Sequence, residues 1–251
     1  MSRLGRIRTE TRAATRSFLR RRTAVFFTFF FPVILVVIFG ALVRTQPTGG
    51  GLFAEPAGYY IPGYLAVVVL FTPLSRVGSE IARHRDGGQF EKLATTPLSR
   101  SEWLIAHTLV NVAIIGAASL LILVLVVAVT DATLVVSPAL AVLPVFVAVG
   151  VALFCGLGAV LGALSDSQDG VIAASNTVAL PLLFLSETFV PPALLPSWFL
   201  PAVAASPLTY FARGTRAITV DGGPWLGDLL ILSGLAVGFL AVGAYAVPRT
   251  D

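Results

Sequence analysis

Residues 103–130 read WLIAHTLVNVAIIGAASLLILVLVVAVT, a run of 28 residues without Asp, Glu, Lys or Arg. An α-helix rises about 1.5 Å per residue, so about 20 apolar residues cross a hydrocarbon core of about 30 Å. This run is therefore long enough to span a membrane. Five further runs also lack these four residue types: 23–43, 56–75, 132–165, 170–186 and 229–248.

A seventh run without charges, 188–212, contains five prolines. No continuous helix tolerates so many, because each proline removes a backbone donor and clashes with the preceding turn. The sequence therefore predicts an all-α membrane protein with six spanning helices and a re-entrant outer segment between the fifth and the sixth. Hydrophobic residues make up 56% of the chain and charged residues 12%, about half of the share usual in soluble proteins.

We expect one transmembrane domain, residues 23–251, preceded by an N-terminal segment, residues 1–22. The first apolar run lacks a small-residue cleavage site behind it, so we expect it to remain as a helix and not to be removed as a signal peptide. Within the N-terminal segment, five residues recur at helical spacing and would share one face, with arginines around them. This pattern is typical of an amphipathic helix lying on a membrane surface. It fits either an anchor that sets topology or a lever that touches a cytoplasmic partner; the five residues are Leu4, Ile7, Thr11, Ala14 and Phe18.

Basic residues divide unequally between the two sides of the predicted membrane. Fourteen of the 17 fall in residues 1–22, residues 76–102 and the C-terminus, and three fall on the opposite side. Because basic loops stay inside, both termini are predicted to be cytoplasmic. The isoelectric point of about 9.7 would also suit nucleic acid. The basic residues are juxtamembrane, however, so anionic lipid is the expected partner and nucleic acid is not.

Residues 76–102 carry the signals of a helix, a stop and a second helix. Asp86 could cap a short helix with Gln89 three residues later. Pro97 would end that helix, because the residue before a proline disfavours the helical conformation. Ser99 and Glu102 then form a capping box that opens the third spanning helix.

The short helix in this loop presents an apolar stripe made by Phe90 and Leu93. Two interpretations are open: the helix lies on lipid, or the stripe is a docking knob for a soluble subunit. Charged residues flank the stripe and are expected to stay in water: Arg83, Arg85, Glu91 and Lys92.

Polar residues inside the predicted spans are few. Asn111 and Asn176 are candidates for a translocation path, or they form hydrogen bonds between helices. Ser186 and Glu187 begin the outer segment, where Glu187 is either a solvated carboxylate or an outer gate that attracts cationic substrates.

The fourth and fifth spans are expected to form a closely packed antiparallel hairpin. Gly158 and Gly162 form a G-x-x-x-G pattern, which allows a neighbouring backbone to approach closely. The connection between the two spans is only five residues long, 165–169, and Asp169 could cap the fifth helix.

The whole pattern resembles the ABC-2 type permeases, the membrane subunits of ATP-driven exporters such as the daunorubicin-resistance and nodulation-factor systems. The loop run resembles the cytoplasmic loop of that family, and segments at the first, second and last spans are similar to its other motifs. This chain has Glu187 where the family often has glycine. The matching segments are Arg85-Asp86-x-Gly88-x-Phe90-Glu91-x-Leu93, Thr96-Pro97-Leu98-Ser99-Arg100-x-Glu102, Phe31-Pro32, Ile61-Pro62-Gly63-Tyr64, Leu195-Pro196-x-Trp198, Ser206-Pro207-Leu208-Thr209 and Arg213 to Arg216.

The resemblance implies a permease of a prokaryotic plasma membrane, paired as a homodimer or heterodimer and served by two ABC ATPase subunits. It implies that the loop between the second and third spans contains the coupling helix. Drugs, lipid-linked molecules, glycans and ions all remain open as substrates. The coupling residues implied are Arg85, Asp86, Gly88, Phe90, Glu91, Leu93 and Pro97.

The chain lacks the residues that would make it an ATPase or a metalloenzyme. A phosphate-binding loop needs G-x-x-x-x-G-K-[ST], yet the only lysine, Lys92, follows Phe90 and Glu91. We therefore expect no cofactor in this chain, with ATP and Mg²⁺ held by the partner. His84 and His107 are expected at loops and interfaces and not as metal ligands. The alternative class, an ion-coupled transporter or channel, usually needs ionisable residues at mid-membrane, where the predicted spans have almost none.

Overall fold

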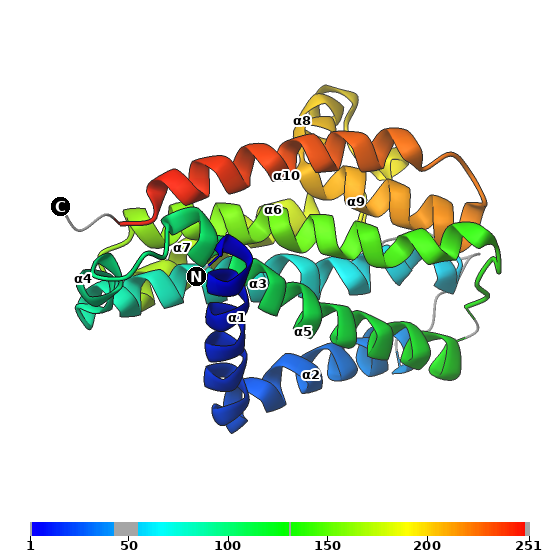
Figure 1. The fold of residues 1–251 in the computed structure, drawn as a ribbon. Coiled ribbons are helices and arrows are strands. Elements are labelled where there is room, and N and C mark those ends of the chain that lie inside the picture. Colours follow the sequence, from blue (N-terminus) through cyan, green and yellow to red (C-terminus); the bar gives the residue numbers. More distant parts are fainter. Residues whose placement is uncertain (1, 43–54, 131, 249–251) are drawn as a thin grey trace.

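The computed structural model describes residues 2–42, 55–130 and 132–248, and within them every regular element is a helix (Figure 1). The α-helices are α1 (Arg3–Arg20), α2 (Arg22–Val36), α3 (Ile61–Asp86), α4 (Gln89–Ala94), α5 (Arg100–Val129), α6 (Leu143–Leu164), α7 (Gln168–Phe184), α8 (Leu200–Ala205), α9 (Pro207–Arg216) and α10 (Leu226–Ala246). Wider π turns continue two of them, η1 (Val37–Leu42) and η6 (Ala217–Asp221). Short 3₁₀ turns are η2 (Ala57–Tyr60), η3 (Pro138–Val142), η4 (Pro192–Leu194) and η5 (Ser197–Phe199).

Five helical stretches are long and apolar enough to cross a membrane, which confirms the predicted all-α membrane fold. The predicted fifth span, 170–186, is occupied by α7, whose 17 residues make a helix about 26 Å long. That is shorter than a typical hydrocarbon core, so the total of six spans stays a prediction. The five stretches are Arg22–Gly40, Ala57–Asp86, Arg100–Val129, Pro138–Leu164 and Leu226–Ala246.

Helix α3 is the centre of the bundle, and α6 packs against it through glycines. A methyl group on Gly158 would lie 2.4 Å from the Leu74 carbonyl oxygen, and one on Gly162 would lie 2.6 Å from that of Gly78. On the other side of α6, a methyl group on Gly243 of α10 would lie 2.5 Å from the Gly156 carbonyl oxygen. The close backbone approach predicted from the G-x-x-x-G pattern is confirmed, and α3 is the neighbour that makes it.

The predicted fourth span was too long at its N-terminal end. The predicted span covers 132–165, but the helix begins only at Pro138, with η3, and continues as α6. Ser137 is extended, with φ −135° and ψ 162°, because it precedes Pro138. The described residues before it, 132–136, form no helix, and the Val135 amide donates to the Thr219 carbonyl at 2.9 Å. Apolar composition alone did not reveal this pairing with η6.

Two predicted helix caps are wrong. Asp86 is the last residue of α3, and α4 starts after Gly88, whose φ of +60° makes the turn between the two helices. Ser167 caps α7 by accepting a hydrogen bond from the Gly170 amide. Asp169 is the second residue of the helix. In that place its charge still favours the helix N-terminus.

The outer segment between α7 and α10 is broken as its prolines predicted. It contains η4, η5, α8 and α9, and α8 projects away from the bundle while α9 returns beside it (Figure 1). Proline occupies the first turn of η4, α8 and α9, where its missing amide costs nothing. The indole of Trp198 is 77% exposed, which suits a residue at the membrane interface.

Helix α1 runs across the other helices instead of along them (Figure 1). Ser2 caps it, Ala14 and Phe18 are buried, and Leu4 at the far end of the same stripe is 80% exposed. Both ends of the described chain and α4 lie at the same end of the bundle (Figure 1). The charge rule predicts that this end is cytoplasmic.

Candidate functional site

The loop between α3 and α5 turns its most apolar residue toward its own chain. Phe90 of α4 is only 8% exposed. Its ring centre lies 5.7 Å from that of Trp103 and 5.5 Å from that of His84, both in edge contacts. Leu93 is half-buried, and Glu91 and Lys92 are exposed. The face of α4 that points away from the bundle is therefore the charged face, and Leu93 lies at its edge. A partner could reach this face.

Phe90 belongs to a cluster of rings, which we call the aromatic node: His84, Phe90, Trp103 and His107. Trp103 stacks on His107 with ring centres 4.0 Å apart and touches His84 at 5.6 Å. Two carboxylates complete it, one from α3 itself and one from α1. Glu80 lies 3.5 Å from His84, and Glu10 of α1 lies 3.4 Å from His107. The node thus joins α1, α3, α4 and α5.

Both histidines lie within this packed cluster of rings. No group of three metal-ligating side chains occurs among the residues that the structure describes.

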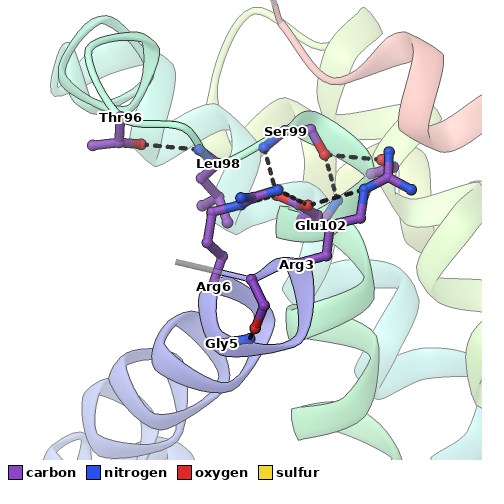
Figure 2. A network of polar contacts seen from close by, with 9 residues as sticks. Arg3, Gly5, Arg6, Thr96, Leu98, Ser99 and Glu102 are labelled. Atoms are coloured by element: carbon purple, nitrogen blue, oxygen red, sulfur yellow. Dashed lines mark hydrogen bonds and ion pairs between the residues drawn. The ribbon is translucent and has the colours of Figure 1, made fainter.

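Glu102 links the loop to α1 (Figure 2). Its carboxylate accepts hydrogen bonds from Arg6 Nε at 2.9 Å and Arg6 Nη2 at 2.5 Å. The same carboxylate accepts the Ser99 amide at 3.0 Å, while Ser99 Oγ accepts the Glu102 amide at 3.2 Å. The predicted capping box is therefore confirmed, and it has a second function that the sequence did not show. The hydrogen bond from Arg6 to Glu102 also raises the pKa of the Arg6 guanidinium.

Two further arginines tie the loop to the rest of the bundle. Arg85 donates to the Ser165 carbonyl, at the turn between α6 and α7, at 2.5 Å. Arg100 donates to the Tyr245 carbonyl at 2.9 Å and the Val247 carbonyl at 3.0 Å, at the end of α10. The partners of Arg6 and Arg100 were not predicted from the sequence, because one arginine among many gives no signal of its partner.

A groove of about 630 Å³ opens beside α4, between the start of α5 and the end of α10. Asp86 and Pro97 are exposed and do not line this groove. Leu93 lines the groove, so its side chain packs against the bundle and can still be reached by a partner. The apolar lining includes Phe90, Leu93, Leu98, Trp103, Tyr245 and Pro248.

The predicted gate residue at the other end of the bundle is buried. Glu187 is 6% exposed and accepts two hydrogen bonds from Arg213, one of them from Nε at 2.8 Å. Arg216 donates to the backbone carbonyl of Glu187 at 2.5 Å and lies over the ring of Tyr59 at 3.9 Å. Ser186 donates to the Leu183 carbonyl at 3.3 Å. Glu187 is thus locked to α9 and is not a solvated carboxylate.

The two predicted path residues within the spans lie in different surroundings. Asn111 is 1% exposed and donates to the His107 carbonyl one turn earlier at 2.8 Å, while its Oδ1 has no partner among the described residues. Asn176 lies on the exposed face of α7. Among the described residues, no hydrogen bond joins Asn111 to Asn176 or Glu187.

Comparison with protein families defines the class of this membrane protein. The family model described as ABC-2 type transporter matches residues 6–220. The chain therefore belongs to the ABC-2 type transporter family, whose members are the membrane subunits of ABC transporters.

Two curated relatives are similar to this chain. The daunorubicin resistance ABC transporter permease protein DrrB1 of Streptomyces coeruleorubidus is 31% identical over 86 residues, 34% of this chain and 30% of that protein. The probable doxorubicin resistance ABC transporter permease protein DrrC of Mycobacterium tuberculosis is 27% identical over 216 residues, 82% of this chain and 74% of that protein. The chain is similar to both, and its own substrate and partners do not follow from their names.

Proposed function

We propose that this ABC transporter membrane subunit is the permease of an exporter whose ATPase is a separate polypeptide that docks on the loop between α3 and α5. One observation carries the proposal: the loop and the ends of α3 and α5 that flank it contact several other elements at the same end of the bundle. Phe90 packs on α5, Arg85 holds the turn before α7 and Arg100 holds the end of α10. Through Glu102 the loop also holds α1.

These contacts give a route by which force on α4 would reach the spanning helices. An ATPase would contact the exposed Glu91 and Lys92 and the groove lined by Leu93. Phe90 is buried against Trp103, so α4 could not move without the start of α5. Packed interiors transmit displacement instead of absorbing it, which suits a coupling element.

The outer segment would act as the gate in this proposal. The pair formed by Glu187 and Arg213 holds the start of the segment to α9. While that pair is closed, the carboxylate is neutralised and offers no free charge to a cationic substrate. Outward release would require α9 to move and the pair to open. Two permease subunits, identical or different, and two ATPases would then alternate between closed and open forms.

The proposal is tested by reconstitution. The purified chain should hydrolyse no ATP, and adding its ATPase should produce hydrolysis that depends on the permease. Substrate identity would then be read from transport into inverted vesicles, with daunorubicin as the first probe because of the relatives' names. ATP hydrolysis by the isolated chain would contradict the assignment.

A further inference from the structure

A second cleft, of about 460 Å³, lies between α1, α2, α3 and α5. None of the residues proposed for coupling lines it, and it shares only His107 with the aromatic node. Its lining changes along its length from arginine and hydroxyl side chains to phenylalanine. The residues that matter for its chemistry are Arg21, Phe27, Phe31, Ser75, Arg76 and Ser79.

Among the described residues, no carboxylate pairs with the positive charge of Arg76 in this cleft. Its Nη1 is buried and has no hydrogen-bond partner among the described residues, and no carboxylate there lies within ion-pair distance of it. The ring of Phe18 covers its guanidinium at 4.2 Å. The nearby Glu80 is already bound by Arg83 at 2.5 Å. A buried cationic nitrogen without an acceptor is costly, so this site is built for an anion that the chain does not itself supply.

Arg21 supplies a second cation at the mouth of the cleft. It is half-exposed and lies 3.6 Å from Glu80, a distance too long for a hydrogen bond. Ser75 and Ser79 add hydroxyl donors on α3. Two guanidinium groups with hydroxyls nearby favour a phosphate, because arginine forks match its oxygens in paired hydrogen bonds.

The opposite wall is apolar and runs along the membrane-spanning direction. Phe27 is 57% exposed and Phe31 is 53% exposed, and both lie on α2 on the cleft side. Phe31 is ten positions after Arg21, so the apolar wall extends about 15 Å from the basic mouth. An acyl chain is the ligand that fits an apolar wall of this length beside a cationic mouth.

We propose that this cleft binds one anionic phospholipid, with its phosphate on Arg76 and Arg21 and an acyl chain against Phe27 and Phe31. The lipid would come from the leaflet that α1 lies against, because the cleft opens on the exposed face of α2. It would bridge α1 and α3, which Phe18 and Arg76 already bring into contact here. The site does not depend on docking of an ATPase or on the transported molecule.

The test is native mass spectrometry of the purified chain after exchange into micelles with phosphatidylglycerol or phosphatidylcholine. Wild type should retain one phosphatidylglycerol and little phosphatidylcholine. Arg76→Gln should weaken retention by about tenfold or more, because a charge-assisted hydrogen bond is lost. Arg12→Gln removes an equal charge from an exposed position on α1 outside the cleft, and it should retain lipid as wild type does.

Two further arms keep the proposal open to contradiction. Ser79→Phe fills the cleft without changing charge and should also release the lipid, which decides the question if Arg76→Gln fails to fold. Inorganic phosphate at millimolar concentration should not displace the lipid, because it cannot use the apolar wall. Equal retention of the two lipids, unchanged retention by the folded Arg76→Gln and Ser79→Phe variants, or displacement by phosphate alone would overturn the proposal.

Discussion

Arg6 donates two hydrogen bonds to Glu102, a residue 96 positions away whose carboxylate also caps α5. One carboxylate thus holds the crosswise helix α1 to the start of a spanning helix and to the loop before it (Figure 2). Any shift of α5 at this point must either carry α1 along or break the pair. The amphipathic helix is therefore tied to the start of α5 and to the loop before it.

Substitutions at Glu102 separate its two functions. Glu102→Gln keeps an oxygen for the capping box but loses the charge that Arg6 binds, whereas Glu102→Ala loses both. We expect Glu102→Ala to lower the melting temperature more than Glu102→Gln, with Arg6→Ala matching the Gln variant. Fluorescence-detected thermal shift in detergent would measure this order. Equal melting temperatures for all three variants and wild type would show that the pair of Arg6 and Glu102 does not stabilise the protein.

Loss of Arg213 should loosen the outer segment. Arg213→Ala would leave the buried Glu187 carboxylate without two hydrogen bonds. The cost is about 1–3 kcal/mol in the free energy of unfolding, moderated because half of the Arg213 side chain is in contact with solvent. Adding Glu187→Gln to Arg213→Ala should recover part of the loss, because no buried charge then remains. A double variant less stable than Arg213→Ala would contradict this account of the pair.

Two glycine substitutions should behave oppositely. Gly162→Ala places a methyl group 2.6 Å from the Gly78 carbonyl oxygen, so α6 and α3 must separate. Overpacking of this kind costs about 1–3 kcal/mol. Gly116→Ala on α5 meets nothing within 4 Å and should be neutral or slightly stabilising. Thermal unfolding of both variants measures the difference, and equal stability would mean that the two backbones are not in tight contact.

Cysteine labelling tests the orientation. In a Cys155→Ser background, Thr95→Cys lies in the loop after α4, and Val136→Cys lies in the connection between α5 and α6, where Val136 is 92% exposed. The distribution of basic residues predicts that an impermeant maleimide labels Val136→Cys in intact cells and Thr95→Cys only after permeabilisation. The reverse pattern would invert the topology.

The predictions from sequence succeeded where one chemical property decides the structure. Charge-free length located the five stretches that can cross a membrane, and the capping box of Ser99 and Glu102 formed as predicted. The prolines of the outer segment broke it into short helices. In each case the determinant is local, so a window of residues contains all the information needed.

The failures have a common physical cause, which is pairing between residues distant in sequence. Nothing in the sequence near Glu187 shows that Arg213 will neutralise it, and nothing near Phe90 shows that Trp103 will bury it. The non-helical segment before η3 is similar, because the hydrogen-bond partner of Val135, Thr219, lies in η6. Composition describes what a segment can do in isolation, and tertiary contacts then choose among the possibilities.

The central claim is that α4 receives the force of a separate ATPase. Glu91→Arg combined with Leu93→Asp changes the exposed charge and the groove edge while leaving the buried Phe90 in place. Val136→Arg, at the opposite end of the bundle, is the control. Co-purification of the ATPase and transport would be measured together at equal membrane expression.

We predict that the double variant inserts and unfolds like wild type but loses most of the bound ATPase and most of the transport, while Val136→Arg keeps both. A double variant that binds its ATPase and transports as well as wild type would show that α4 is not the coupling element.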